Sequence, residues 1–443
     1  MKKKYKFKKK FIISFLLLLI LVTASLIYIF VINKPKEEKK EPIKEEKEVI
    51  IIDYVKKINE KTSLDTKFLK WIEDNYKDSL INLDKILEEK DYSDTLWHDV
   101  TGYSYKVLKD LYADKYKDMS NIKVLESKDI AKIDFTGDIS LSDDWYVGQA
   151  YTSRNKKVYG ILSEDTVKIM NDSDFMVVNS EFTVSNRGTK MAGKQYTFRA
   201  KPERLNIYHE MGVDLALLAN NHVYDYGKDA FLDMLDHFKE YNIPYIGAGK
   251  NFEEAKSAYY IILNGYKIAF LNATRAEKYI MTPEATDTNP GVFRCYDTTN
   301  LINEIKKAKE ESDFVITIVH FGTEFSHSLE EVQTSSARSY IDAGSDMVVG
   351  HHAHVLQGVE IYNDKPIIYN LGNFIFNGAT VDTAIYEVRL DKNGNMEYYI
   401  IPHIQSNVYT SLADESNKQR IIKDMNSWSI NANIDNDGKI TKK

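Results

Sequence analysis

Short apolar runs alternate with stretches of helical spacing from Ala131 onward, and this alternation is the feature that most constrains the fold. The apolar runs are rich in β-branched residues and have the length of strands. They cover residues 132–136, 175–178, 215–218, 259–263, 267–272, 314–319, 347–349 and 366–369. Three intervening segments, 228–241, 301–311 and 330–343, have apolar residues at helical spacing. Strands that alternate with helices predict an α/β domain, which we place at residues 131–405.

The C-terminal part of the chain departs from this alternation. Residues 384–390 and 396–402 read as two antiparallel strands joined by a turn at Asn393-Gly394. Residues 406–443 are predicted to form a polar helix and a tail. Within the tail, residues 433–438 resemble the start of a calcium loop, but the last ligand position is missing and we interpret the segment as a simple turn.

Four segments of different composition precede the α/β domain. Residues 1–10 hold seven lysines, and residues 11–32 carry no charge and are long enough to span a bilayer. We interpret 11–32 as an uncleaved signal anchor, with a cleaved secretory signal as the alternative. The lysines before it predict that the rest of the chain lies outside the cytoplasm. Residues 33–48 are a Lys/Glu/Pro stalk, and residues 49–128 have the pattern of a small helical module.

Charge and cysteine content exclude several classes of function. The net charge is −7, and without the basic tail the remainder has 52 basic against 66 acidic residues, or −14. Such a body repels polyanions, which argues against nucleic acid as a partner. The single cysteine, Cys295, excludes an intrachain disulfide and a cysteine-based zinc site.

Polar side chains follow the ends of successive predicted strands. Each group alone has an ordinary structural explanation, such as a turn, a helix cap or a buried histidine. Their recurrence favours a site, because the carboxyl ends of strands in open α/β sheets form the binding edge. The groups are Gly137-Asp138, Asn179-Ser180-Glu181, Asn220-Asn221-His222 with Asp225, His320 with Glu324, His351-His352-Ala353-His354, and Asn370 with Asn373.

The histidine-rich group suggests a metal. In an extended backbone, His352 and His354 share a face while His351 points away. Carboxylate, amide oxygen and imidazole together suit zinc, manganese or iron. The number of these groups exceeds the needs of one tetrahedral ion, so we expect one or two divalent ions and water-activating hydrolytic chemistry.

The same residues lie in motifs that resemble a known family. The motifs are GDISLSDD (137–144), NSE (179–181), YTFRAKPE (196–203), LANNHVYDYG (218–227), GAG (247–249), HFGTEF (320–325), GHHAHVLQGVE (350–360) and NLGNFIF (370–376). In this order they resemble the bacterial CapA family of poly-γ-glutamate capsule synthesis proteins. The resemblance implies a calcineurin-like metallophosphoesterase fold, a β-sandwich flanked by helices with a two-metal site.

The resemblance also implies roles for individual residues. His222 resembles a histidine that acts on the leaving group or transition state, and Arg199 resembles an arginine that holds an anionic substrate. The metal ligands implied are Asp138, Glu181, Asn221, His320, His352 and His354. Ser140 departs from the broader phosphoesterase pattern, which has a histidine at that position, so one ion would have one imidazole fewer.

Three functions are compatible with this sequence. The first is a membrane-anchored, extracytoplasmic metal-dependent hydrolase that acts on a phosphoester or amide, with an anionic polymer or a phosphoester as its substrate. The second is a non-catalytic metal-binding subunit that works with other capsule polymer synthase subunits. The third is an envelope metallophosphoesterase unrelated to capsule. Ser140 favours the second over ordinary phosphatase chemistry.

Overall fold

The computed structural model describes residues 66–76, 97–98, 101–276 and 281–443. The chain divides into two compact units, residues 1–77 and 78–443, and each is considered by itself. In the first unit, the described residues form α3 (Thr66–Asn75), whose Phe68 and Ile72 are buried one turn apart. The predicted basic tail, membrane anchor and stalk lie outside the described residues. No helix among the residues described has both the length and the apolar character needed to cross a membrane.

The second unit contains two large mixed sheets, which we name sheet A and sheet B. Sheet A has the order β1 (Ile122–Val124), β9 (Tyr259–Leu263), β10 (Tyr266–Thr274), β12 (Phe314–His320), β13 (Met347–His351), β15 (Lys365–Ile368) and β14 (Val359–Tyr362). Sheet B has the order β19 (Thr410–Leu412), β18 (Met396–Gln405), β17 (Val381–Asp391), β2 (Ile130–Ile139), β3 (Phe175–Ser180), β6 (Leu215–Leu217) and β7 (Tyr245–Ile246), with β16 (Asn373–Ile375) also paired to β2. In each sheet the central strands are parallel: β10, β12, β13 and β15 in one, and β2, β3, β6 and β7 in the other.

The two sheets pack face to face. Successive side chains of a strand point to opposite faces, so one face of each sheet contributes to a shared core. Phe175 and Val177 of β3 enter one core together with Ile268 and Phe270 of β10, so this core lies between the sheets. Met176 of β3, one position away in the alternation, belongs to a different core on the outer face of sheet B.

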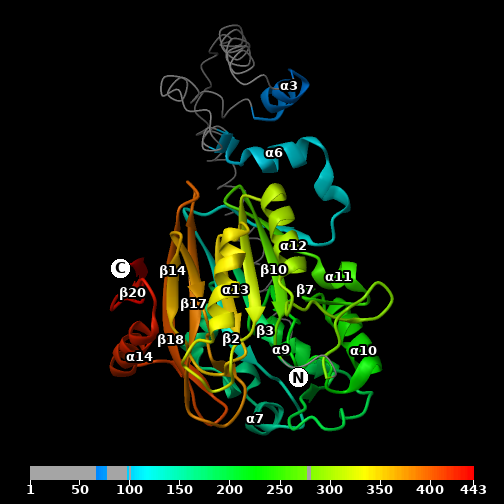
Figure 1. Cartoon of the computed structure of the whole chain (residues 1–443), viewed down its shortest axis with the longest axis vertical. Coiled ribbons are helices and arrows are strands. Elements are labelled where there is room, and N and C mark those ends of the chain that lie inside the picture. Colours follow the sequence, from blue (N-terminus) through cyan, green and yellow to red (C-terminus); the bar gives the residue numbers. More distant parts are fainter. Residues whose placement is uncertain (1–65, 77–96, 99–100, 277–280) are drawn as a thin grey trace, which may run out of the picture. The chain divides into compact units, whose positions relative to one another are not determined.

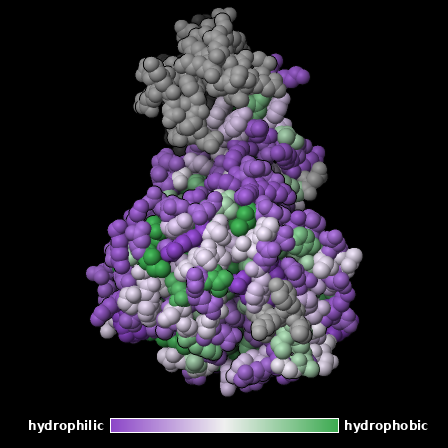
Figure 2. Space-filling model, viewed as in Figure 1, coloured by the Kyte–Doolittle hydropathy of each residue, from purple (hydrophilic) through white to green (hydrophobic). Residues whose placement is uncertain are grey.

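Helices cover the outer faces. The outer core of sheet B contains residues of α7 (Tyr146–Arg154), α8 (Glu164–Asn171), α9 (Asn206–Glu210) and α10 (Gly227–Glu240). The outer core of sheet A contains residues of α11 (Phe252–Lys256), α12 (Thr299–Glu311) and α13 (Glu331–Asp342). Figure 1 shows α12 and α13 lying over sheet A beside β10. The domain is therefore a mixed α/β sandwich flanked by helices, as predicted. On the face shown in Figure 2, hydrophilic residues predominate and hydrophobic residues form small separate patches.

The ends of the second unit differ in detail from the sequence predictions. Within the predicted helical module, α6 (Tyr105–Tyr112) is a helix, but β1 is a strand that pairs in parallel with β9. β1 has only three residues, two of them exposed, so it carries too little alternation to be recognised. The predicted pair near the C-terminus is β17–β18. After α14 (Glu415–Trp428) the tail is a hairpin, β20 (Ala432–Ile434) with β21 (Ile440–Lys442), whose connection is the predicted turn.

Candidate metal centre

The predicted ligands meet where the parallel strands of both sheets end. Asp138 lies at the end of β2 and Glu181 directly follows β3. His320 is the last residue of β12, whereas Asn221, His222, His352 and His354 lie in the loops after β6 and β13. All of them are buried, with exposed fractions of 7% or less. The strand-end argument thus correctly grouped side chains that lie far apart in the sequence.

One oxygen of Glu181 is the centre of the cluster. Its Oε1 lies 3.6 Å from His320 Nε2, 3.8 Å from His354 Nε2 and 4.0 Å from His222 Nε2. It has no hydrogen-bond partner among the described residues, and the same holds for Nδ1 of the neighbouring His352. Buried polar atoms are nearly always paired, so these two require an explanation. Three overlapping sets have ligand atoms within 4.8 Å of one another: Glu181, His320 and His352; Asp138, Glu181 and His354; and Glu324, His352 and His354.

Hydrogen bonds orient the histidines. His354 Nδ1 donates to Asn373 Oδ1 over 2.8 Å, which turns its Nε2 toward Glu181. Asn179 Nδ2 donates to Asp138 Oδ1 over 2.7 Å and to Glu181 Oε2 over 3.1 Å. Such outer partners fix the orientation of metal ligands. Asn221 Oδ1 accepts from His320 Nε2 over 2.8 Å, so these two candidate ligands face each other.

The pKa values of several groups in the cluster are shifted, mainly by burial. Burial raises the pKa of Glu181 well above its ordinary value, and the nearby Asp138 adds to that rise. Burial would also raise the pKa of Asp138, but the hydrogen bond from His354 holds it below its usual range. Burial lowers the pKa of His352 to about 3 and that of His320 well below its ordinary value. Burial would also lower the pKa of His354, but the hydrogen bond and the charge of Asp138 raise it above its ordinary value. Buried carboxylates and imidazoles gathered this closely are an arrangement that a divalent cation stabilises.

His352 and His354 reach the site through a loop conformation that the sequence did not indicate. β13 ends at His351, whose Nε2 lies 2.9 Å from Thr136 O, so His351 points away as predicted. His352 and His354 are not in an extended strand, because their φ angles are +97° and +59°. Such angles are uncommon outside glycine, so the surrounding structure must hold this loop in place. The pairing of His352 with His354 was right, and the strand geometry used to reach it was wrong.

His222 is positioned by a buried ion pair. Its Nδ1 donates to Asp225 Oδ2 over 2.7 Å, and the other oxygen of Asp225 lies 2.7 Å from Lys194 Nζ. Lys194 also donates to the backbone oxygen of Asn221. The backbone N–H of Phe198 donates to Asp225 Oδ2 over 2.7 Å. This arrangement leaves Nε2 of His222 facing Glu181, 4.0 Å from its Oε1.

Arg199 is the one predicted site residue that the structure does not bring to the cluster. Its guanidinium lies over the Tyr226 ring at 4.1 Å and its Nη1 donates to Arg187 O over 3.3 Å. Its role in binding an anion stays a prediction. Ser140 is buried, and its backbone N–H donates to Ile375 O over 2.7 Å.

Several residues of the site were not among the predicted ligands. Glu324 stands in the motif after β12, and Asn373 is the first residue of β16 in the motif after β15, so the strand-end argument had a signal for both. Asn179 and Asp225 had the same signal. No sequence pattern indicated Lys194, because it lies in a loop without periodicity and only the folded chain brings it into contact with Asp225.

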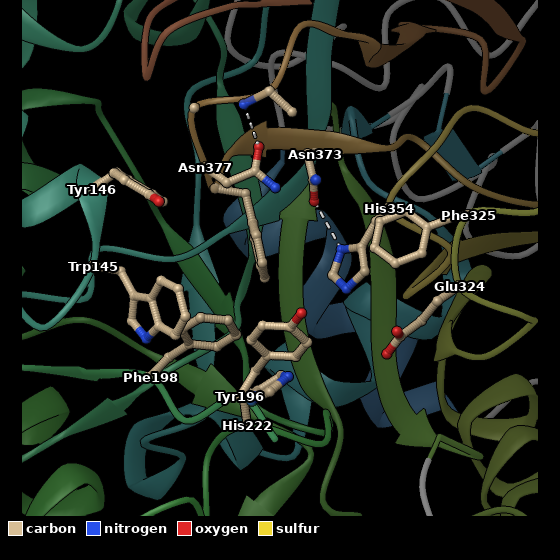
Figure 3. Close-up of a pocket in the computed structure, with 13 residues that line it drawn as sticks. Trp145, Tyr146, Tyr196, Phe198, His222, Glu324, Phe325, His354, Asn373 and Asn377 are labelled. Atoms are coloured by element: carbon tan, nitrogen blue, oxygen red, sulfur yellow. Dashed lines mark hydrogen bonds between the residues drawn. The ribbon is translucent and has the colours of Figure 1, made fainter. Parts of the chain in front are cut away.

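A cavity of about 560 Å³ opens beside the cluster. Its lining residues are Trp145, Tyr146, Tyr196, Phe198, His222, Glu324, Phe325, His354, Asn373, Phe376, Asn377, Gly378 and Ala379. Figure 3 shows His354 and Glu324 at one end of the cavity and Trp145 with Phe198 at the other, with His222 and Tyr196 between them. The centre is thus accessible from a cavity whose walls are largely aromatic.

Comparison with known proteins identifies relatives of this chain. Residues 132–378 match the family model described as "Bacterial capsule synthesis protein PGA_cap". The capsule biosynthesis protein CapA of Bacillus anthracis is 32% identical over 267 residues, which are 58% of this chain and 64% of that protein, just under two thirds of its length. The PGA biosynthesis protein CapA of Bacillus subtilis (strain 168) is 31% identical over 327 residues, 71% of this chain and 83% of that protein.

Among solved structures, a 5′-nucleotidase from Candida albicans SC5314 aligns with 63% of this chain and 53% of its own. The sequence identity is 12% and the TM-score is 0.33. A likeness of this size carries no conclusion about activity.

Proposed function

This chain belongs to the PGA_cap family of bacterial capsule synthesis proteins, and from that premise we propose that it acts in the synthesis or export of poly-γ-glutamate or a similar anionic capsule polymer. We propose further that its buried cluster is a divalent-metal centre of the hydrolase type. The observation that carries the second proposal is Glu181 Oε1, an unpaired buried oxygen with three imidazole Nε2 atoms at 3.6 to 4.0 Å.

The residues present fit a metal. The three imidazole Nε2 atoms lie too far from Glu181 Oε1 for hydrogen bonds, and this oxygen has no hydrogen-bond partner among the described residues. Asp138, Glu181, Asn221, His320, His352 and His354 would hold one or two ions, and their mixture of oxygen and imidazole suits zinc, manganese or iron. When bound, such an ion polarises an ester and lowers the pKa of water.

The chain's own groups would supply the remaining chemistry. The hydrogen bond to Asp225 fixes His222 with Nδ1 protonated, so Nε2 is the atom that exchanges a proton with a leaving group. Lys194 keeps Asp225 from turning away, because it contacts the other carboxylate oxygen. The burial of both partners excludes water from this pair.

The proposed location is the outer face of the cell membrane. The uncharged segment 11–32 after seven lysines supports an anchor whose C-terminal part is extracytoplasmic. Other polymer synthase subunits in the membrane are the proposed partners. An acidic body of this charge would contact a polyanion only at a local positive focus, which bound metal would supply.

A second candidate function rests on Ser140. The imidazole expected two residues after Asp138 in phosphoesterases is absent, which favours a metal site that grips a carboxylate or phosphate without turnover. Under this alternative the protein is a non-catalytic subunit of the same polymer synthase. No residue of the site favours the third candidate, an envelope phosphoesterase unrelated to capsule, in the way that Ser140 favours the second.

Metal analysis of the full-length protein tests the centre. We expect one or two divalent transition ions per chain in the wild type, and loss of this content in His352→Ala combined with His354→Ala. Loss of an outer partner alone commonly lowers metal affinity about 10–100-fold, so removal of two ligands should empty the site. His237→Ala is the matched control, because this histidine lies on α10 and pairs with Glu240. Unchanged metal content in the double variant would reject the centre.

A gene deletion tests the biological role. We expect the deletion to remove surface polymer, and the wild-type gene or the His237→Ala gene to restore it. The double histidine variant should restore it poorly. A cell that keeps its full anionic capsule after deletion, with no second copy of the gene, would rule out the capsule role.

A further inference from the structure

The cavity beside the metal centre has a wall of aromatic rings that the proposed chemistry does not use. We name Trp145, Tyr196, Phe198 and Phe376 the aromatic wall. Trp145 comes from the start of α7, Tyr196 and Phe198 from the segment before β5 (Arg199–Ala200), and Phe376 from the segment after β16. Three segments far apart in the sequence therefore build one surface (Figure 3).

The aromatic wall is held in place. Trp145 Nε1 donates to Thr197 O over 2.8 Å, which fixes the plane of the indole. Phe198 meets Trp145 edge-on with ring centroids 5.6 Å apart, and it meets Phe376 edge-on at 5.2 Å. Aromatic pairs at these separations are stabilising, so the surface exists before a ligand arrives.

The aromatic wall continues directly into the metal centre. The ring of Phe198 lies 4.4 Å from that of His222, and the ring of Phe376 lies 4.6 Å from that of His354, measured between centroids. A ligand whose anionic group lies at the cluster would place its next group against these rings.

The surroundings of the aromatic wall select against a charged group. Glu324 is the one carboxylate among the cavity-lining residues, and no lysine or arginine lines the described cavity. A carboxylate moved onto the aromatic wall would lose water without gaining a cation, which is costly. A cationic group would be repelled by a divalent ion in the adjoining centre.

The rim is also aromatic. Tyr146, Tyr196 and Phe325 line the cavity and are 55%, 49% and 68% exposed. Large apolar rings left in water around a cavity are typical of ligand-binding sites. Asn373 and Asn377 add amide groups between the rings and the polar end.

We propose that the aromatic wall binds an uncharged ring with an apolar face, and that this ring is attached to the anionic group held at the metal centre. This inference rests on the proposed function, because the metal must hold the anion. The ring is a sugar, an aryl group or a base, because each of these has an apolar face. The ligand that occupies the aromatic wall is accordingly a small ring-bearing phosphoester, and a stretch of polyanionic backbone does not lie along the aromatic wall.

A matched pair of phosphonates tests the inference without any turnover. Phenylphosphonate and methylphosphonate carry the same anionic group and differ in the ring. Their dissociation constants are measured by calorimetry on the metal-loaded full-length protein. We expect the phenyl compound to bind about 5- to 100-fold more tightly, the usual range for one ring stacked on aromatic side chains. Trp145→Ala and Tyr196→Ala should shrink this ratio and leave the affinity for methylphosphonate unchanged.

Tyr159→Ala is the control variant, because Tyr159 is 49% exposed and is not one of the lining residues. It should leave the ratio unchanged. Tyr196 is itself half exposed, so its truncation tests the inference even where Trp145→Ala disturbs folding. Glucose 1-phosphate, measured in the same way, distinguishes a sugar from an aryl group as the preferred ring.

Equal binding of the two phosphonates would overturn the aromatic wall as a binding surface and leave the metal centre standing. Failure to bind either phosphonate, in protein that metal analysis finds loaded, would overturn both the inference and the anion-holding role of the centre. Tight binding of a glutamate pentapeptide that depends on Trp145 would also overturn the inference, because it would show that the aromatic wall accepts a polyanion.

Discussion

β2 carries Asp138 of the candidate metal centre near its end and a second buried acid, Asp134, in its middle. Asp134 is fully buried and lies in register with Glu387 on β17. The nearby cations pair with Glu387: Lys132 Nζ lies 3.0 Å from its Oε2 and Arg389 Nε lies 2.6 Å from its Oε1. Burial therefore raises the pKa of Asp134 to about 7, and the charge of Glu387 adds to the rise. We predict that Asp134→Asn stabilises the protein above neutral pH.

The sign and size of the effect follow from proton linkage. The ordinary pKa of this carboxyl is 3.8, so between that pH and about 7 the folded protein holds a proton that the unfolded chain releases. Stability consequently falls as pH rises through this window. Roughly three units at 1.36 kcal/mol each amount to about 4 kcal/mol by pH 8. The asparagine amide resembles the protonated acid in shape and has no charge to lose, so it avoids this cost.

Urea unfolding at a series of pH values from 4.5 to 8, followed by tryptophan fluorescence, measures the difference. We expect wild type and Asp134→Asn to differ least in their free energies of unfolding at the acid end, and the variant to gain up to about pH 7 and to keep that gain to pH 8. Asp129→Asn is the control: this carboxylate is exposed and paired with Lys392, so its loss should bring no gain at high pH. A difference between Asp134→Asn and wild type that is flat with pH, or that favours the wild type at pH 8, would refute the reasoning.

Three other predictions address the site and the anchor. His222→Ala should keep the bound metal, measured by elemental analysis, and lower turnover of an aryl phosphate about 10²–10⁴-fold, because its Nε2 is a positioned proton donor and not a ligand. Metal that leaves with the imidazole would contradict this role. Gly137→Ala should lower the free energy of unfolding by about 1–3 kcal/mol, because an added Cβ would stand 2.1 Å from Gly372 O; Gly378→Ala, with open space around it, should not. External protease on spheroplasts should digest the domain of residues 131–405, and full protection would contradict its extracytoplasmic location.

Local patterns in the sequence predicted much of the fold. The continuous apolar runs 259–263 and 314–319 located β9 and β12 closely, because a strand between two apolar layers must place apolar side chains on both faces. The polar residues after such runs predicted which side chains lie together, because parallel strands of one sheet end at one edge; their role as metal ligands stays a prediction. β1 escaped prediction, because three mostly exposed residues take their strand conformation from the neighbouring β9 and carry no pattern of their own.

The sequence by itself determined which side chains would gather. Asp138, Glu181, His320 and the histidines after β13 each lie at or just after the end of a strand that an apolar run predicts. The tertiary structure alone decided how they face one another. It placed three imidazoles around one oxygen of Glu181 and brought Lys194 onto Asp225. It also turned Arg199 onto Tyr226 and away from the cluster. The physical reason is that the pattern of apolar residues in a strand depends only on which of its side chains are buried against the sheet. The loops that build the cavity take their conformation from contacts with segments 50 or more positions away in the sequence.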